Sequence, residues 1–202
     1  MPNTPKRLGE LVTEAKKRGA SRAKIVPASI IVLDERVRLK CSVPLCDNYG
    51  RHLLCPPNVM PMDQFRRTLK SFKHALLLQI ESDYDSLDKS TKHLDADLCT
   101  NIEKATGTRG FERKLTQLVE EMEALAFKKG FYLAAGLGGS ECILCETCVG
   151  QGSEEPCRHP FRARPSMQAL GIDVIRTCES AGMPIRLSSD HKVRWTGIVL
   201  LD

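Results

Sequence analysis

The run from Ala75 to Ile80 constrains the fold most, because it is apolar along both faces of any strand that it could form. A strand with one face in water alternates apolar and polar residues, whereas a strand buried on both faces is apolar almost throughout. Residues 75–80 are therefore predicted to form a central strand with helices packed on both sides.

Helical periodicity is strongest between residues 115 and 126. Apolar side chains recur there at the spacing of one helix face: Leu115, Leu118, Val119, Met122, Leu125 and Ala126. Gly130 stands where a left-handed residue commonly ends a helix. Shorter helices are predicted around residues 5–18, 65–72, 84–98 and 171–181.

Further strands are predicted at residues 23–33, 131–135, 183–187 and 193–201, the last two as a terminal antiparallel hairpin. Strands that alternate with helices indicate an α/β fold, which we expect to be a single layered domain spanning residues 1–202. Its sheet is predicted to be mixed and flanked by helices. Two cysteine-rich loops, at about residues 41–58 and 136–160, interrupt this pattern.

Composition limits the classes of function. The 202 residues contain no apolar segment near the ~20 residues that span a bilayer, and the first twenty have no apolar signal core. We therefore expect a cytoplasmic protein that does not associate with a membrane. A net charge of +5 and 5% aromatic residues argue against nucleic-acid binding. Nine cysteines in a reducing compartment indicate metal binding or redox chemistry.

The most specific motif is Cys-x2-Cys-x2-Cys-x8-Cys, formed by Cys142, Cys145, Cys148 and Cys157. Structural zinc sites usually pair two Cys-x2-Cys units across a longer stretch. Three cysteines at successive spacings of three, with a fourth farther on, are instead typical of a loop that wraps a [4Fe-4S] cluster. The sequence therefore predicts such a cluster, with structural zinc as the alternative.

A second motif, Cys-x4-Cys-x8-Cys, contains Cys41, Cys46 and Cys55 on a segment broken by prolines. No fourth cysteine is near. A second metal site is expected, completed by Cys99, by a non-cysteine ligand or by an open coordination position. The alternatives are that both loops share one site, or that these three cysteines are buried thiols that bind nothing.

Other residues near the motifs have weaker interpretations. Cys178 and Cys99 lie on apolar helical stripes, which favours core packing. His159 is a candidate proton donor or ligand, although an exposed loop histidine is the simpler interpretation. Three arginines crowd the end of the second loop, where they could offset the negative charge of a cluster, dock an acidic partner or be solvated: Arg158, Arg162 and Arg164.

Together, the segments LDERVRLKCSVPLCDNYGRHLLCPPN and CILCETCVGQGSEEPCRHPFRARPSMQALGIDV resemble an uncharacterised prokaryotic family of predicted metal-binding proteins. The resemblance runs along nearly the whole chain. It implies that the cysteines of both motifs bind metal, and it implies no particular reaction.

We therefore expect an iron–sulfur protein that carries one [4Fe-4S] cluster, or two, and exchanges electrons with a protein partner. Two alternatives stay open. The Cys41, Cys46 and Cys55 site could hold a cluster with an open iron and make the protein a redox or sulfur-chemistry enzyme, whose small-molecule substrate the sequence does not indicate. Alternatively, the cysteines could bind structural zinc ions that stabilise a protein-interaction module without redox activity.

Overall fold

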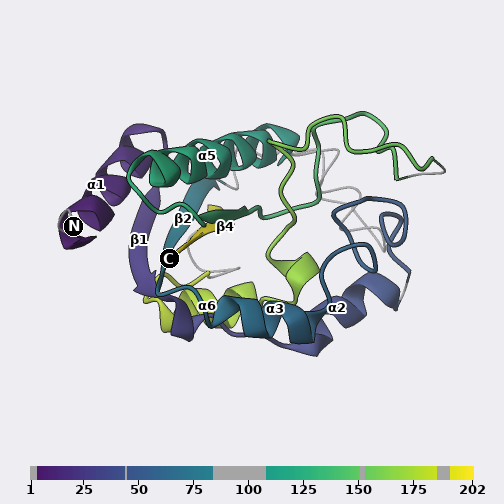
Figure 1. Ribbon diagram of the computed structural model, residues 1–202, viewed down its shortest axis with the longest axis horizontal. Helices are drawn as coiled ribbons and strands as arrows, with labels where there is room; N and C mark the ends of the chain where they lie inside the picture. Colours follow the sequence, from purple (N-terminus) through teal and green to yellow (C-terminus); the bar gives the residue numbers. More distant parts are fainter. Residues whose placement is uncertain (1–3, 44, 84–107, 151–152, 186–191) are drawn as a thin grey trace.

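The computed structural model describes residues 4–43, 45–83, 108–150, 153–185 and 192–202. Its secondary structure forms three layers (Figure 1). Helices α1 (Thr4–Lys17) and α5 (Thr108–Lys128) cover one face of a sheet. Helices α2 (Glu35–Ser42), α3 (Met62–Leu69) and α6 (Val174–Ser180) lie on the opposite side. The predicted α/β class, with helices flanking a sheet, is confirmed.

Within the described residues, the sheet has four strands in the order β1-β2-β4-β3. Their bounds are Arg22–Pro27 for β1, His74–Asp83 for β2, Ala135–Leu137 for β3 and Lys192–Leu201 for β4. All three pairings are antiparallel, so the expectation of a mixed sheet is corrected in this detail. The physical reason is that β2 and β4 pair directly with each other over ten residues, although about a hundred residues separate them.

The central strand is covered on both faces, as predicted from residues 75–80. Leu76 and Leu78 pack with α1 and α5, whereas Ala75 and Leu77 pack against the opposite layer. All four have no exposed surface. Alternate side chains of one strand therefore supply two separate cores, which is why this run contains so few polar residues.

The polar member of that run, Gln79, is also fully buried. Its Nε2 donates hydrogen bonds to the Met183 carbonyl at 3.0 Å and to Thr196 Oγ1 at 3.4 Å. Cys178 is fully buried beside it, with its sulfur 3.7 Å from the same Nε2. The prediction that Cys178 packs in the core is confirmed.

Several predicted boundaries need correction. Residues 131–134 form a turn rather than a strand, because Phe131 is buried against α1, with the Arg7 guanidinium 4.5 Å from its ring. Strand β3 begins only at Ala135. Residues 183–185 are in no strand, so β4 pairs with β2 and β3 instead of a terminal hairpin partner. The helix predicted at residues 84–98 lies outside the described residues.

The prediction for α5 is confirmed, including its end: Gly130 has a φ of 88°, the left-handed conformation that glycine adopts without strain. Residues 28–30 form a short 3-10 helix and residues 35–42 form α2, so the strand predicted at residues 23–33 ends at Pro27. No helix in the described part of the chain is long and apolar enough to cross a membrane.

Candidate metal centre

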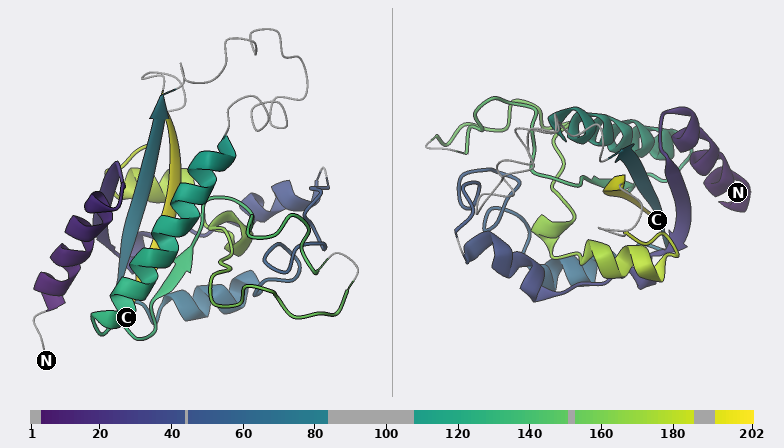
Figure 2. Two further views of the ribbon diagram at one scale, coloured as in Figure 1. Left: turned by 90° about the horizontal axis from the view of Figure 1, so that it is seen from above. Right: turned by 180° about the vertical axis from the view of Figure 1, so that it is seen from behind.

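Two cysteine loops lie at the same end of the molecule, away from the N-terminal helix (Figures 1 and 2). The first cysteine loop, residues 41–58, begins in the last turn of α2 and continues to the segment before α3. The second cysteine loop, residues 136–160, follows β3. The 86 residues from Pro56 to Glu141 separate the two motifs in sequence, and the tertiary fold brings the loops side by side.

The second loop starts from a rigid base. A Cβ atom on Gly139 would lie 2.7 Å from the Thr196 carbonyl oxygen and 2.8 Å from a Leu115 methyl group, so only glycine lets the backbone pack this closely. The Gly138 N–H donates to the Pro165 carbonyl at 2.9 Å, and the Met167 N–H donates to the Gly138 carbonyl at 2.9 Å. The two ends of the second-loop region, at Gly138 and at residues 165–167, are therefore hydrogen-bonded to each other.

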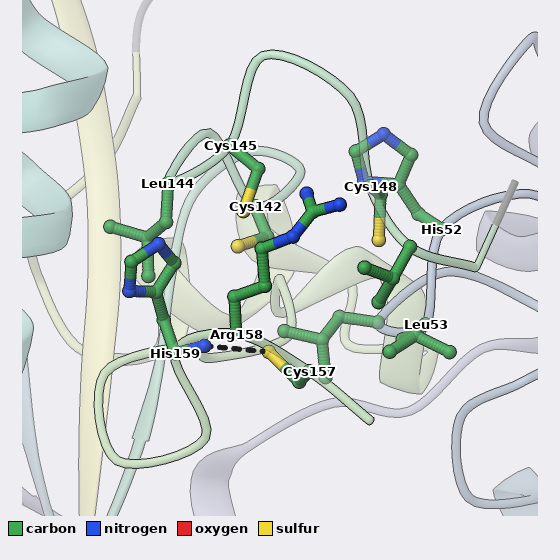
Figure 3. Close-up of a pocket in the computed structure, with 11 residues that line it drawn as sticks. His52, Leu53, Cys142, Leu144, Cys145, Cys148, Cys157, Arg158 and His159 are labelled. Atoms are coloured by element: carbon green, nitrogen blue, oxygen red, sulfur yellow. Dashed lines mark hydrogen bonds between the residues drawn. The ribbon is translucent and has the colours of Figure 1, made fainter. Parts of the chain in front are cut away.

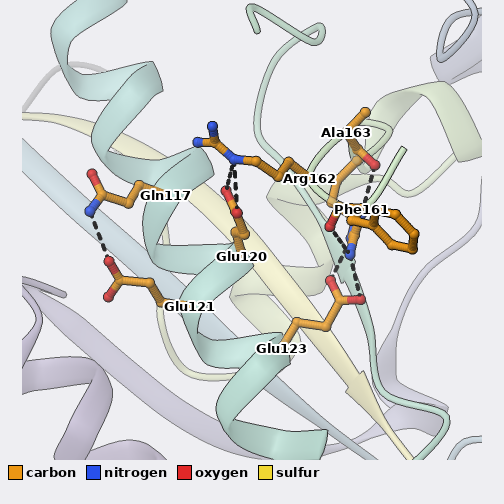
Figure 4. Close-up of polar contacts among 8 residues, drawn as sticks. Gln117, Glu120, Glu121, Glu123, Phe161, Arg162 and Ala163 are labelled. Carbon is orange, nitrogen blue, oxygen red and sulfur yellow. Dashed lines mark hydrogen bonds and ion pairs between the residues drawn. The ribbon is translucent and has the colours of Figure 1, made fainter. Parts of the chain in front are cut away.

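Two of the three arginines near the end of the second loop form ion pairs with α5 (Figure 4). Arg162 forms an ion pair with Glu120 at 2.9 Å. The Arg164 guanidinium makes a two-pronged contact with the Glu123 carboxylate, which also accepts the Gly136 N–H at 3.0 Å. The charges of these two arginines are thus balanced by glutamates of α5, a role that the sequence did not indicate.

The four cysteines of the second loop line one pocket, the four-cysteine pocket (Figure 3). Cys142, Cys145, Cys148 and Cys157 surround it, together with side chains from the first loop, including His52 and Leu53. Burial raises the pKa of the Cys142 thiol, and the neighbouring cysteine thiols raise it further. The structure therefore gathers the complete Cys-x2-Cys-x2-Cys-x8-Cys motif around a single centre.

Three polar groups accompany these thiols. The backbone N–H of His159 donates to Cys157 Sγ at 3.4 Å. Arg158 extends into the pocket, and its Nη1 donates to the Thr147 carbonyl at 3.1 Å. Nδ1 of His52 is buried and has no hydrogen-bond partner among the described residues. The His159 N–H, the Arg158 guanidinium and the unpartnered His52 Nδ1 therefore belong to residues that line the same pocket as the four thiols.

In the described part of the chain, the thiols are not drawn together to ligand distance from one point. Zinc would hold four ligand atoms about 2.0–2.3 Å from one point. Within the residues that the structure describes, no three His, Cys, Asp or Glu side chains are grouped so that they could hold one metal ion. The four thiols instead surround a shared space.

Cys41, Cys46 and Cys55 line a second cavity, the three-cysteine cavity, of about 210 Å³. Residues 139–141 of the second loop also line it, as do Ser166, Gln168 and Ala169 beyond that loop. The Cys46 N–H donates to the Cys41 carbonyl at 3.0 Å, which holds these two residues together. Burial raises the pKa of the Cys55 thiol to about 12, with the Glu141 carboxylate as a further cause.

The pocket and the cavity are each lined by residues of both loops, and residues adjacent in sequence divide between them. Leu53 and Leu54 line the four-cysteine pocket, whereas the next residue, Cys55, lines the three-cysteine cavity. Likewise, Glu141 faces the cavity and Cys142 faces the pocket. Gly150 of the second loop lies against the first loop: a Cβ there would lie 2.5 Å from the Arg51 carbonyl oxygen and 3.1 Å from Leu53 N.

Sequence reasoning missed two residues of this centre, His52 and Gln168. His52 is adjacent to none of the cysteines in sequence, and Gln168 lies beyond both motifs, so spacing alone did not single them out. His159 lines the four-cysteine pocket. Cys99 lies outside the described residues.

Comparison with known families places the chain in a family of predicted metal-binding proteins. Residues 24–201 match the model of the family described as "Predicted metal-binding protein (DUF2284)". The chain belongs to this family, and both cysteine loops lie within the matched region. Searches of curated proteins and of solved structures find no match.

Proposed function

We propose that this metal-binding protein is an iron–sulfur protein in which Cys142, Cys145, Cys148 and Cys157 hold a [4Fe-4S] cluster. One observation carries the proposal: these four thiols line a single pocket in the order and spacing of a cluster-binding loop. Such a cluster, when bound, supplies a one-electron redox couple.

The surrounding residues suit that group. The thiolates would place negative charge in the pocket, and the Arg158 guanidinium lies beside them to offset it. The His159 N–H already donates to a thiol sulfur, and N–H···S hydrogen bonds tune the potential of a cluster. Leucine side chains of the first loop exclude water from one side. Together, these contacts would set the reduction potential and protect the cluster.

We further propose that electrons pass to or from a protein partner at this end of the molecule. Phe161 immediately follows the second loop and is 89% exposed. An exposed aromatic side chain beside a redox centre is a natural contact for a partner, because aromatic residues are enriched at protein interfaces. A cytoplasmic location fits the chemistry, since none of the eight cysteines in the described part of the chain forms a disulfide.

A second candidate function is supported by the three-cysteine cavity. Three thiols and about 210 Å³ of adjacent space would leave a coordination position of a metal open to a small molecule. That arrangement would permit enzymatic redox or sulfur chemistry in addition to electron relay. Structural zinc in an interaction module is the non-redox alternative.

The test is an anaerobic count of iron, acid-labile sulfide and zinc per chain, together with a visible spectrum. About four irons and four sulfides are expected for one cluster and about eight of each for two, with a broad absorbance that dithionite bleaches. A colourless, zinc-loaded protein would overturn the iron–sulfur proposal and leave the structural alternative.

A further inference from the structure

A cavity of about 520 Å³, the α3 cavity, lies apart from both cysteine sites, beside α3 in the layer opposite α1 and α5 (Figure 1). Its lining comes from two segments, within residues 28–33 after β1 and residues 66–72 at the end of α3. None of its lining residues lines the four-cysteine pocket or the three-cysteine cavity. The volume lies within the range of small-molecule sites, ~300–1,000 Å³.

The buried part of this lining is apolar. Ala28, Ile31 and Leu69 are 2%, 7% and 8% exposed, and all three belong to the hydrophobic core on this face of the sheet. Leu33 and Phe72 are partly buried and pack against the same core. A hydrocarbon chain in the α3 cavity would therefore exchange water for apolar side chains, which favours binding.

The charged part of the lining is cationic. Arg66 on α3 and Lys70 at its C-cap are four residues apart in helical backbone, so their side chains lie on one face of the helix. The third polar side chain is that of Ser29, and no acidic residue in the described part of the chain lines the cavity. The last carbonyl groups of α3 accept N–H groups of the turn that follows, which reduces the negative partial charge at this helix end. The lining therefore complements an anion.

These two cations are only weakly neutralised by the described residues. Arg66 Nη2 lies 3.9 Å from Glu35 Oε1, and the two side chains are 46% and 80% exposed, so this ion pair contributes little. Lys70 makes no ion pair with a described residue. By contrast, the adjacent Arg67 is paired with Asp63 at 2.9 Å and does not line the cavity. The charges beside the cavity are thus the ones available to a ligand.

We infer that the α3 cavity binds a small amphiphilic carboxylate, with its acyl chain on Ile31, Leu69 and Phe72 and its carboxylate between Arg66 and Lys70. A carboxylate suits this pair of cations, because a guanidinium presents two parallel N–H donors to its two oxygens and an ammonium adds a further donor. The inference requires no metal at either cysteine site. It therefore goes beyond the proposed function and assigns the protein an organic ligand at a separate place.

The probes for this inference are octanoate, 1-octanol and butanoate, each titrated at neutral pH into the full-length, metal-loaded protein by isothermal titration calorimetry. Octanoate and 1-octanol share a chain length and differ in the carboxylate, whereas butanoate keeps the carboxylate and has a shorter chain. We expect octanoate to bind at least about tenfold more tightly than 1-octanol, because charge-assisted hydrogen bonds are lost in the alcohol. Octanoate should also bind at least about tenfold more tightly than butanoate, since each buried methylene contributes about fourfold.

Substitutions identify the site. Arg66→Gln and Lys70→Gln should each weaken octanoate binding by about fivefold and leave the affinity for 1-octanol unchanged, because both side chains are partly in water. Ser29→Trp, at an exposed position of the lining, should weaken the binding of octanoate and 1-octanol alike by filling the cavity. Arg67→Gln is the matched control, because it removes the same charge from the same helix outside the cavity. Circular dichroism shows whether each variant is folded.

The outcomes separate this inference from the proposed function. Equal affinity of the wild type for octanoate and 1-octanol would overturn the carboxylate site, as would the absence of saturable octanoate binding. An equal loss of octanoate affinity in Arg66→Gln and Arg67→Gln would also overturn it, because the attraction would then come from general surface charge. The iron, sulfide and zinc contents test the proposed function independently, so a colourless, zinc-loaded protein that binds octanoate in this way would support the α3 cavity while removing the cluster.

Discussion

The four-cysteine pocket and the three-cysteine cavity use the same kind of side chain in different surroundings. The free space beside the four thiols is about 20 Å³, close to that of one water molecule, whereas the space beside the three thiols is about 210 Å³. Leu53, Leu54, Leu144 and Val149 crowd the pocket. Gln168, Glu141 and Ser140 line the cavity.

This difference teaches that the thiols alone do not determine what a metal at each site could do. A metal in the pocket would be surrounded by protein, which suits electron relay. A metal in the cavity would face polar groups and open space, which suits a bound small molecule. The comparison therefore predicts two sites with separate chemistry that share a wall.

The largest effect should come from removing one thiol at each site. We expect Cys148→Ala to lose most of the metal of the four-cysteine pocket and Cys55→Ala to lose that of the three-cysteine cavity, because thiolates supply both the charge and the bonds that hold it. The measurement is metal content together with the visible spectrum. Cys178→Ala is the control, since that thiol packs in the core and both metals should remain. If either single substitution empties both sites, the two loops share one centre and the comparison fails.

Metal removal should affect the loops far more than the layers. Among the described residues, the two hydrophobic cores on the faces of the sheet contain none of the seven motif cysteines. The chelated protein should therefore keep most of its helical circular dichroism, while residues 136–160 become sensitive to protease. Loss of most helical signal on chelation would show that the metal stabilises the whole domain, as zinc does in zinc fingers.

Substitution of Gly150 tests the contact between the two loops. In Gly150→Ala the new methyl group would meet the Arg51 carbonyl at 2.5 Å, and backbone cannot move aside as easily as a flexible side chain. We expect the variant to lose about 1–3 kcal/mol of stability from overpacking and to bind less metal at both sites. Chemical denaturation and metal analysis provide the measurements.

Gly9→Ala is the matched control for this substitution. Gly9 lies within α1 and has open space around it, so the same change there should stabilise the protein by roughly 0.5–1 kcal/mol. Unaltered metal content in Gly150→Ala would show that the loops tolerate separation and bind metal independently.

Two ion pairs from α5 provide a comparison at the base of the second loop. Glu123 pairs with Arg164 and also accepts the Gly136 N–H, with both charged side chains largely buried. Glu120 pairs with Arg162, whose side chain is 54% exposed. Glu123→Gln should destabilise the protein by about 2 kcal/mol, and Glu120→Gln by under about 1 kcal/mol.

Urea denaturation measures both changes in stability, and limited proteolysis shows whether the second loop loosens. The first loop should keep its metal in either variant, because neither glutamate contacts it. If the two substitutions lower the free energy of unfolding equally, burial of the Glu123–Arg164 pair does not stabilise the loop.

The smallest effect concerns the base of the first loop. Asp34 caps α2 by accepting the Arg36 N–H at 2.9 Å, and its side-chain contact with the same arginine lowers the pKa of the carboxyl from 3.8 to about 2. A carboxyl with a depressed folded-state pKa stabilises the protein above its unfolded-state pKa and loses that contribution as the pH falls. The wild type should therefore lose stability between about pH 4 and pH 2.

Asp34→Asn should lack this pH-dependent contribution. Its stability should lie slightly below that of the wild type at neutral pH, and the difference should vanish near pH 2. Thermal melts of the two metal-free proteins between neutral pH and pH 2 measure this difference in stability. A constant difference at every pH would show that the Asp34 carboxylate is not the source.

Local patterns were sufficient for the elements that depend on short-range contacts. The apolar residues 75–80 predicted a doubly covered strand, and the spacing from Leu115 to Ala126 predicted α5, because periodicity directly reflects which face is buried. The cysteine spacing singled out seven candidate ligands. Their assignment as ligands stays a prediction, although the structure gathers each set around its own space.

The sequence-based predictions failed where contacts with distant segments outweigh the local preference of a residue. Residues 131–134 have the composition of a strand, but burial of Phe131 against α1 makes them a turn. For Arg162 and Arg164 the sequence left several roles open and did not indicate their carboxylate partners, which lie about forty residues earlier on α5. Ion pairs between distant segments have no signature in local spacing.

The sequence by itself therefore determined the α/β class, the doubly covered central strand, the long amphipathic helix and the grouping of cysteines into two motifs. The tertiary structure alone decided the antiparallel strand order, the meeting of the two cysteine loops and the placement of His52 and Gln168 beside the thiols. The physical reason is that periodicity and spacing act within one segment, whereas strand pairing and loop contact depend on how the whole chain returns on itself to bury both faces of the sheet.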